Sequence, residues 1–114
     1  MTKTPEVRQF GYRTPRYNFP GNFSVEIKRA GCARLISAEG IDISADGIAV
    51  AVREPILLGS AVLLAIPLGE GTVVSLAGRV SDQRGENCRI TFEFPTAEQC
   101  EQIQGLISAF TNLR

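Results

Sequence analysis

Apolar and polar residues alternate along much of the chain after its first twenty residues. Near the start of this region Phe23, Val25 and Ile27 are separated by single polar residues. Successive side chains of a β-strand point to opposite faces, so the pattern predicts a half-buried strand. Similar segments, each bounded by turn residues, predict six strands in all: 22–28, 32–43, 48–53, 61–66, 72–82 and 88–94.

The last of these segments alternates over its whole length, with Cys88, Ile90, Phe92 and Phe94 on one face. Six antiparallel strands at short, even spacing favour a closed or nearly closed barrel, because the edges of a small sheet must be covered. We expect much of the core to come from residues of several strands: Phe23, Val25, Ile27, Val50, Leu64, Val74, Ile90 and Phe92.

A helix is predicted after Pro95. Thr96 and Gln99 match a capping box, in which each side chain bonds the other's backbone N–H. Apolar residues then recur at helical spacing, and we expect this stripe to lie across a barrel opening as core: Cys100, Ile103, Leu106, Ile107 and Phe110.

The turn between the second and third strands carries polar residues that have two interpretations. Asp46-Gly47 is a residue pair that tolerates positive φ, and we expect the chain to reverse there. Asp42 and Ser44 occupy alternate positions and are expected to project from one face as a hydrogen-bonding platform, beside a glycine that lets a flat ligand approach. Alternatively, these residues only cap a hairpin. Gly40, within the second strand, suggests a bulge or bend.

Residues 1–21 contain three prolines and two glycines without sustained periodicity, which predicts an extended arm with no core of its own. Residues 1–20 hold four basic residues and one acidic residue, whereas the whole chain has net charge zero. Arg13 and Arg16 lie among aromatic neighbours, and guanidinium groups suit phosphate oxygens and the acceptor edge of guanine. The alternative is a solvated charged tail.

Length and composition limit the possible functions. At 114 residues the chain fits one folded domain, which we expect at residues 22–114, after the arm of residues 1–21. Its three cysteines are far apart and it has no histidine, so we expect no metal site and no disulfide framework. Without a histidine, a cysteine with a paired base or an evident carboxylate pair, we do not expect an enzyme. No apolar run is long enough to span a bilayer, which favours a cytoplasmic protein. Because the basic charge lies in the arm rather than on the folded body, we expect no DNA or RNA partner.

Together these features resemble the PilZ domain family, the bacterial receptors for cyclic di-GMP. The resemblance rests on the arginine-bearing arm, on Asp42-x-Ser44-x-x-Gly47, and on a six-stranded antiparallel barrel closed by a C-terminal helix. It implies that the arm wraps over the barrel mouth, that arm arginines clamp phosphates and a guanine, and that the turn bonds the guanine edge.

The arm departs from the family pattern Arg-x-x-x-Arg, because only two residues separate Arg13 from Arg16. The implied cyclic di-GMP site comprises Arg13, Arg16, Asp42, Ser44 and Gly47, and Tyr12 and Arg8 are further candidates. The resemblance implies a receptor that passes a second-messenger signal to a protein partner in motility, exopolysaccharide or biofilm control. The alternative is a degenerate PilZ-like adaptor that binds no nucleotide and acts through protein contacts alone.

Overall fold

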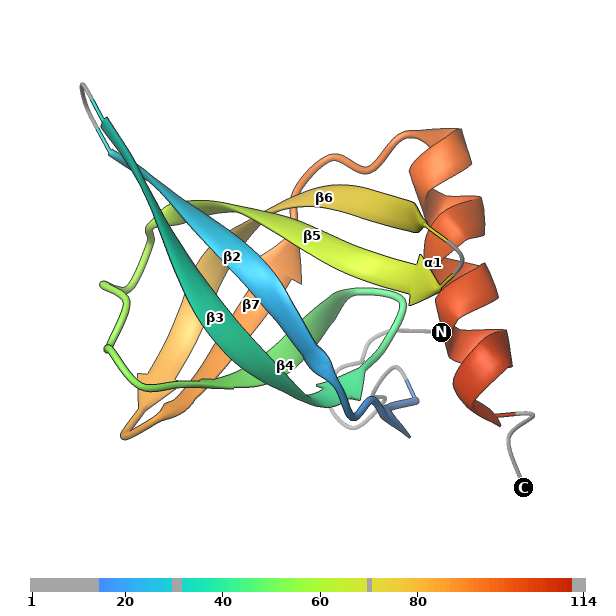
Figure 1. Ribbon diagram of the computed structural model, residues 1–114, viewed down its shortest axis with the longest axis horizontal. Coiled ribbons are helices and arrows are strands. Elements are labelled where there is room, and N and C mark those ends of the chain that lie inside the picture. The colour runs from blue at the N-terminus through green and yellow to red at the C-terminus, as the bar shows by residue number, and fades with distance from the viewer. Residues whose placement is uncertain (1–14, 30–31, 70, 112–114) are drawn as a thin grey trace, which may run out of the picture.

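The computed structural model describes residues 15–29, 32–69 and 71–111. Within these ranges the chain forms seven strands and one helix (Figure 1): β1 Tyr17–Asn18, β2 Asn22–Arg29, β3 Cys32–Ile43, β4 Gly47–Val52, β5 Ala61–Gly69, β6 Thr72–Arg84, β7 Asn87–Phe92 and α1 Ala97–Thr111. All strand pairs are antiparallel. The strands follow the order β1-β3-β2-β5-β6-β7-β4, and β3 also pairs with β4, so β2 to β7 form a closed barrel.

The predicted six-stranded antiparallel barrel with a C-terminal helix is therefore confirmed, and the short strand β1 is additional. β1 pairs with the last residues of β3, Asp42 and Ile43, on the same side of β3 as β2. A register shift between Gly40 and Asp42 marks a bulge in β3, as the glycine there suggested. β5 continues past Pro67 to Gly69 with a register shift of its own, so it is longer than expected.

The core lies inside the barrel and consists of the alternating residues of its strands. All eight predicted core residues are buried, and none is more than 8% exposed. The part of the arm that the structure describes adds Phe19, which is 3% exposed and packs near Phe23 with ring centroids 6.1 Å apart. Burial of aliphatic and aromatic side chains is the main favourable contribution to folding, and here residues from the arm share in it.

Helix α1 covers one end of the barrel and contacts β1 and β6 (Figure 1). The predicted capping box is confirmed: Gln99 N donates to Thr96 Oγ1 at 3.0 Å, and Thr96 N donates to Gln99 Oε1 at 2.9 Å. Ile103, Leu106 and Ile107 are buried as expected.

The prediction for Cys100 is wrong, because its side chain is exposed. The first turn of α1 is fastened by Gln99 instead, whose Nε2 donates to Ser75 O on β6 at 3.2 Å. This turn therefore meets the barrel through a polar contact rather than through the apolar stripe. The side chain of Phe110 lies outside the described part of the structure.

The prediction for Phe94 is also wrong. β7 ends at Phe92, and Phe94 is 91% exposed with φ of 47°. Glu93 N donates to Ala77 O at 2.9 Å, and beyond that bond the chain turns away toward α1. Apolar and polar residues thus continue to alternate in the sequence beyond Phe92, where the strand ends and side chains no longer face the barrel interior.

Among the described residues, no helix is both long and apolar enough to cross a membrane.

Candidate functional site

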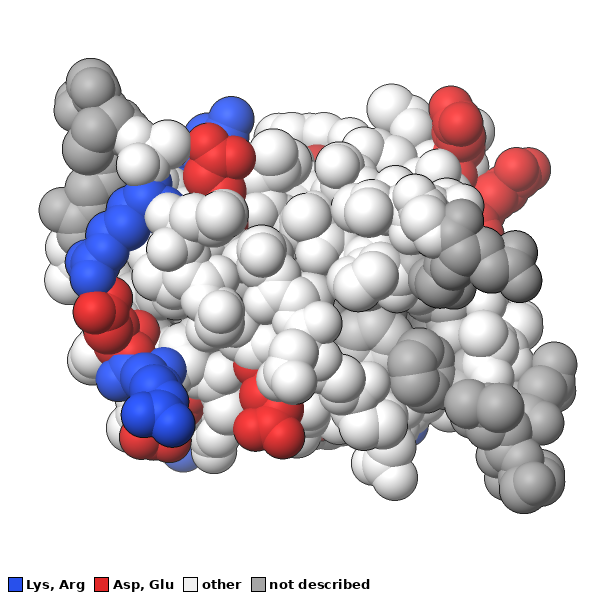
Figure 2. Space-filling model, viewed as in Figure 1, with Lys and Arg blue, Asp and Glu red and all other residues white. Residues whose placement is uncertain are grey.

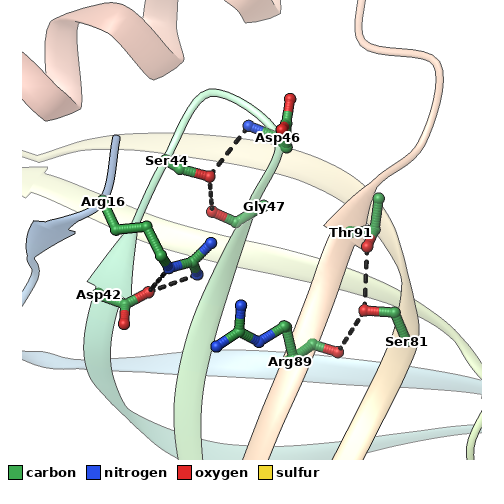
Figure 3. Close-up of polar contacts among 8 residues, drawn as sticks. All are labelled: Arg16, Asp42, Ser44, Asp46, Gly47, Ser81, Arg89 and Thr91. Carbon is green, nitrogen blue, oxygen red and sulfur yellow. Dashed lines mark hydrogen bonds and ion pairs between the residues drawn. The ribbon is translucent and has the colours of Figure 1, made fainter. Parts of the chain in front are cut away.

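The turn between β3 and β4 is held together by Ser44 (Figure 3). Its backbone N–H donates to Gly47 O at 2.9 Å, its hydroxyl donates to the same oxygen at 3.4 Å, and that hydroxyl accepts from Asp46 N at 3.2 Å. Ser44 is fully buried, and these bonds satisfy its hydroxyl and its backbone N–H. The interpretation of Ser44 as a hairpin cap is therefore the one that the geometry supports.

The structural reason for a glycine at position 47 differs from the one expected. Neither Asp46 nor Gly47 has positive φ, so the prediction of a left-handed reversal there is wrong. The reversal instead runs through Ser44, Ala45 and Asp46 and relies on the serine bonds. A Cβ at Gly47 would lie 2.3 Å from Ile90 O, so glycine is needed where β4 passes close to β7.

Arg16 and Asp42 form an ion pair beside this turn (Figure 3). Arg16 Nε donates to Asp42 Oδ1 at 2.7 Å, and Arg16 Nη2 contacts the same oxygen. The side chains are 29% and 24% exposed, so both remain accessible to a ligand. Pairing of Asn18 with Asp42 brings the arm alongside β3 and explains how the two charged groups meet.

The residues after Arg16 are anchored to β3. Phe19 N donates to Ile41 O at 3.0 Å, and Gly40 N donates to Gly21 O at 2.8 Å. A Cβ at Gly40 would lie only 2.0 Å from Phe19 O, so this glycine also allows the arm to approach. The described part of the arm thus carries Arg16 to a fixed position.

Arg89 is a site residue that the sequence analysis did not select. Asp42 lies opposite Ala49, and Ala49 lies opposite Arg89, so the three side chains share one outer face across β3, β4 and β7. In Figure 3 Arg89 points toward the Arg16–Asp42 pair. The small side chain of Ala49 leaves the surface low between the two charged residues.

This face is hollowed into an open depression of about 470 Å³, with these residues in its lining: Asp42, Ala49, Asp82, Arg84, Cys88 and Arg89. Arg16 is paired with Asp42, and Arg84 Nε lies 3.2 Å from Asp82 Oδ2. Arg89 has no ion-pair partner among the described residues. An unpaired guanidinium beside a partly accessible carboxylate suits a ligand that combines anionic oxygens with N–H donors.

Cys88 does not supply a nucleophile to this depression. Burial, with a smaller contribution from the charge of Asp82, raises the pKa of the Cys88 thiol to about 11. The thiol is therefore protonated at neutral pH, and the thiolate is the reactive form. Within the described ranges no group of three or more potential metal ligands lies together.

Three of the predicted ligand residues, Arg8, Tyr12 and Arg13, lie outside the described residues. The structure brings together Arg16 and Asp42 and places Ser44 and Gly47 in the adjoining turn, with the Ser44 side chain buried. Asp42 and Ser44 therefore do not present a shared exposed platform.

A model of the PilZ domain family matches residues 11–109. A search of curated proteins found no match. Among solved structures, the chain is similar to the PilZ domain of CeSA from a cellulose-synthesizing bacterium, with 19% identity over 87% of this chain and 100% of that one and a TM-score of 0.68. It is also similar to the PilZ domain of YcgR from Escherichia coli, whose structure includes cyclic di-GMP, with 14% identity over 90% and 92% of the two chains and a TM-score of 0.70. The family match spans most of the chain and the fold agrees with it, so this protein belongs to the PilZ domain family.

Proposed function

We propose that this domain binds cyclic di-GMP on the outer face of β3, β4 and β7 and passes that signal to a protein partner. The proposal rests chiefly on the Arg16–Asp42 pair, because Asp42 lines a depression that also holds Arg89, a guanidinium with no ion-pair partner among the described residues. A cyclic dinucleotide carries phosphate oxygens for guanidinium groups and guanine N–H donors for a carboxylate. The partly exposed pair meets both requirements within one small area.

The residues have distinct proposed roles. Asp42 accepts hydrogen bonds from the guanine edge, while Arg16 and Arg89 bind phosphate or the acceptor edge of guanine. Ser44 and Gly47 belong to the site through the turn that fixes Asp42, since the serine hydroxyl is buried in the turn and the glycine meets β7.

In the arm, Arg13 is the next candidate for a phosphate contact, with Arg8 as a further donor and Tyr12 as a stacking group. Because Arg13 and Arg16 do not match the spacing Arg-x-x-x-Arg, one arginine of that pattern is missing from the arm. Arg89 on the barrel would supply a guanidinium in its place. The expected role is binding rather than catalysis, in the cytoplasm, with motility, exopolysaccharide or biofilm control as the regulated process.

The free protein also supports a second candidate, an adaptor that binds no nucleotide. Arg16 and Asp42 already satisfy each other, and a ligand must replace that bond with contacts at least as favourable. A domain that had lost nucleotide binding could keep the pair simply to hold the arm on β3, and its function would then lie in protein contacts.

Calorimetric titration of the purified protein with cyclic di-GMP tests the proposal. Wild type is expected to show saturable binding. Asp42→Ala is expected to lose it, because a charge-assisted hydrogen bond contributes roughly 1.5 to 3 kcal/mol, or about tenfold to more than a hundredfold in affinity.

The matched control is Glu101→Ala, which removes an exposed carboxylate from α1 and is expected to bind as wild type does. Circular dichroism verifies that each variant is folded. Equal affinities for wild type and Asp42→Ala would remove Asp42 from the site, and absence of binding by wild type would favour the adaptor.

A further inference from the structure

The N-terminal half of β3, residues 32–37, has an open edge. β3 pairs with β2 from Cys32 to Glu39, but it pairs with β4 only from Ala38 onward. Among the described strands, none pairs with residues 32–37 on the side of β4. Figure 1 shows that the connection from β4 to β5 diverges from this half of β3, where the β2–β3 hairpin projects from the barrel.

The direction of the backbone groups along this edge follows from neighbouring bonds. Val52 N donates to Glu86 O, away from β3, so Ala51 directs its groups toward its partner Glu39. Gly40 N donates the opposite way, to Gly21 O. Strand groups alternate sides at each residue, and therefore Ser37, Leu35 and Ala33 direct their N–H and C=O groups toward the open side, as Glu39 does.

This edge lacks three of the features with which proteins discourage strand addition, a proline, a lysine and a bulge, and its one charged residue, Arg34, is paired with Glu54. Residues 32–37 include no proline and no lysine. The bulge in β3 lies between Gly40 and Asp42, beyond the open stretch. The middle of the edge carries Leu35, which is 68% exposed.

A groove of about 710 Å³ runs beside the open edge, with these residues in its lining: Arg34, Leu35, Ser37, Arg53, Glu54 and Glu86. An ion pair between Arg34 and Glu54 links β3 to the connection that diverges from it. Charged side chains of both signs gather on this side of the molecule in Figure 2. The groove thus places an unpaired strand edge next to polar and apolar side chains.

We propose that this edge binds an extended segment of a partner protein as an added strand, antiparallel to β3 and in line with β4. Main-chain hydrogen bonds to Ala33, Leu35 and Ser37 would provide affinity, and an apolar side chain of the segment would cover Leu35. This surface is separate from the depression at Asp42 and Arg89.

The charges of the groove indicate the chemistry of the segment. Glu39 and Glu86 have no ion-pair partner among the described residues, and Arg53 likewise has none, which leaves an excess of acidic groups. Basic residues in the segment would complement this excess.

In the register centred on Leu35, a second copy of the chain fits the edge poorly. If two hairpins paired antiparallel about Leu35, the end of one would lie opposite Ala38 of the other, and Val52 already occupies that position. The edge therefore suits a linear segment that bends or ends beside β4.

Two variants at one position separate backbone pairing from side-chain contact. Leu35→Pro removes an N–H that faces the open side and leaves the bonds to β2 intact, because proline is tolerated on the free side of an edge strand. Leu35→Ala removes the same side chain and keeps the N–H. The probe is a capped decapeptide of alternating valine and lysine, titrated by fluorescence anisotropy, and its matched control is the same peptide N-methylated at alternate residues.

Wild type is expected to bind the unmodified peptide, Leu35→Ala to bind it several-fold more weakly, and Leu35→Pro not to bind it. The N-methylated peptide is expected to fail with wild type, which tests the pairing even if Leu35→Pro does not fold. Equal binding of both peptides, or no binding of either, would overturn the proposal. A Leu35-dependent dimer in analytical ultracentrifugation would assign the edge to a second copy and would overturn it too.

Discussion

Replacement of Gly47 by alanine tests whether this glycine serves the barrel or a ligand. The added Cβ would lie 2.3 Å from Ile90 O and 3.1 Å from Thr91 Cα. Both are backbone atoms of β7, which is paired with β4 on one side and with β6 on the other. β7 therefore has little freedom to retreat, and the two strands must separate or shift to admit the methyl group.

Overpacking of this kind typically costs about 1 to 3 kcal/mol. For a domain near 100 residues, 1 kcal/mol corresponds to roughly 4 to 8 °C in Tm, so we expect Gly47→Ala to lower Tm on the order of 10 °C. Urea unfolding followed by circular dichroism gives the free energy of unfolding, and calorimetry gives Tm.

Gly105→Ala is the matched control, since the same methyl group added to α1 would meet no atom within 4 Å apart from the adjoining backbone of the helix itself. Alanine is favoured over glycine in a helix interior by about 0.8 to 1.0 kcal/mol, so this variant is expected to be more stable than wild type. If Gly47→Ala unfolded at the wild-type temperature while losing ligand affinity, the packing explanation would be refuted and Gly47 would be a ligand-approach residue.

The remaining predictions concern the arm and a buried thiol. Arg16→Ala should weaken cyclic di-GMP binding more than Arg8→Ala, and wild-type affinity should fall with added salt, both measured by calorimetry; equal effects of the two variants would contradict the role of Arg16. Tyr12→Arg, which restores the family spacing to Arg16, should tighten binding, and unchanged affinity would show that the spacing is not limiting. The Cys88 thiol has a pKa of about 11 in the folded protein against an ordinary 9.0. As pH rises, the thiol therefore ionises at a lower pH in the unfolded chain than in the folded protein. The free energy of unfolding should fall by roughly 2 kcal/mol between about pH 9 and pH 11. Urea unfolding across this range should show the fall in wild type and a smaller one in Cys88→Ala, and parallel curves would exclude Cys88 as the cause.

The barrel could be predicted because alternation within a strand depends only on neighbouring residues. Val25, Ile90 and the other core residues fall on the inner face once the period of two is recognised. The same pattern misled at Phe94, since alternation continued after the last bond to β6 had been made. Local sequence does not show where a strand loses its partner.

The site was only partly predictable for the same reason. Asp42 and Arg16 could be selected from their chemistry and from the family motif. Arg89 could not be selected in this way. Alternation places its side chain on the outer face of the barrel, but the sequence does not show that β7 pairs with β4, and only this pairing brings Arg89 toward Asp42. The burial of Phe19 likewise depends on Gly40, a residue distant in sequence that leaves room for the arm.

The most direct test of the nucleotide site is an NMR titration of uniformly ¹⁵N-labelled protein with cyclic di-GMP. If the proposal is correct, the amide shifts that change most will belong to residues 16–18, to the turn 42–47, and to Ala49 and Arg89. Asp42, Ala49 and Arg89 line one depression, and residues 16–18 and the rest of the turn lie beside Asp42, although these segments are far apart in sequence. Saturating ligand that left these amides unchanged, or that shifted only amides elsewhere on the barrel, would contradict the proposed site.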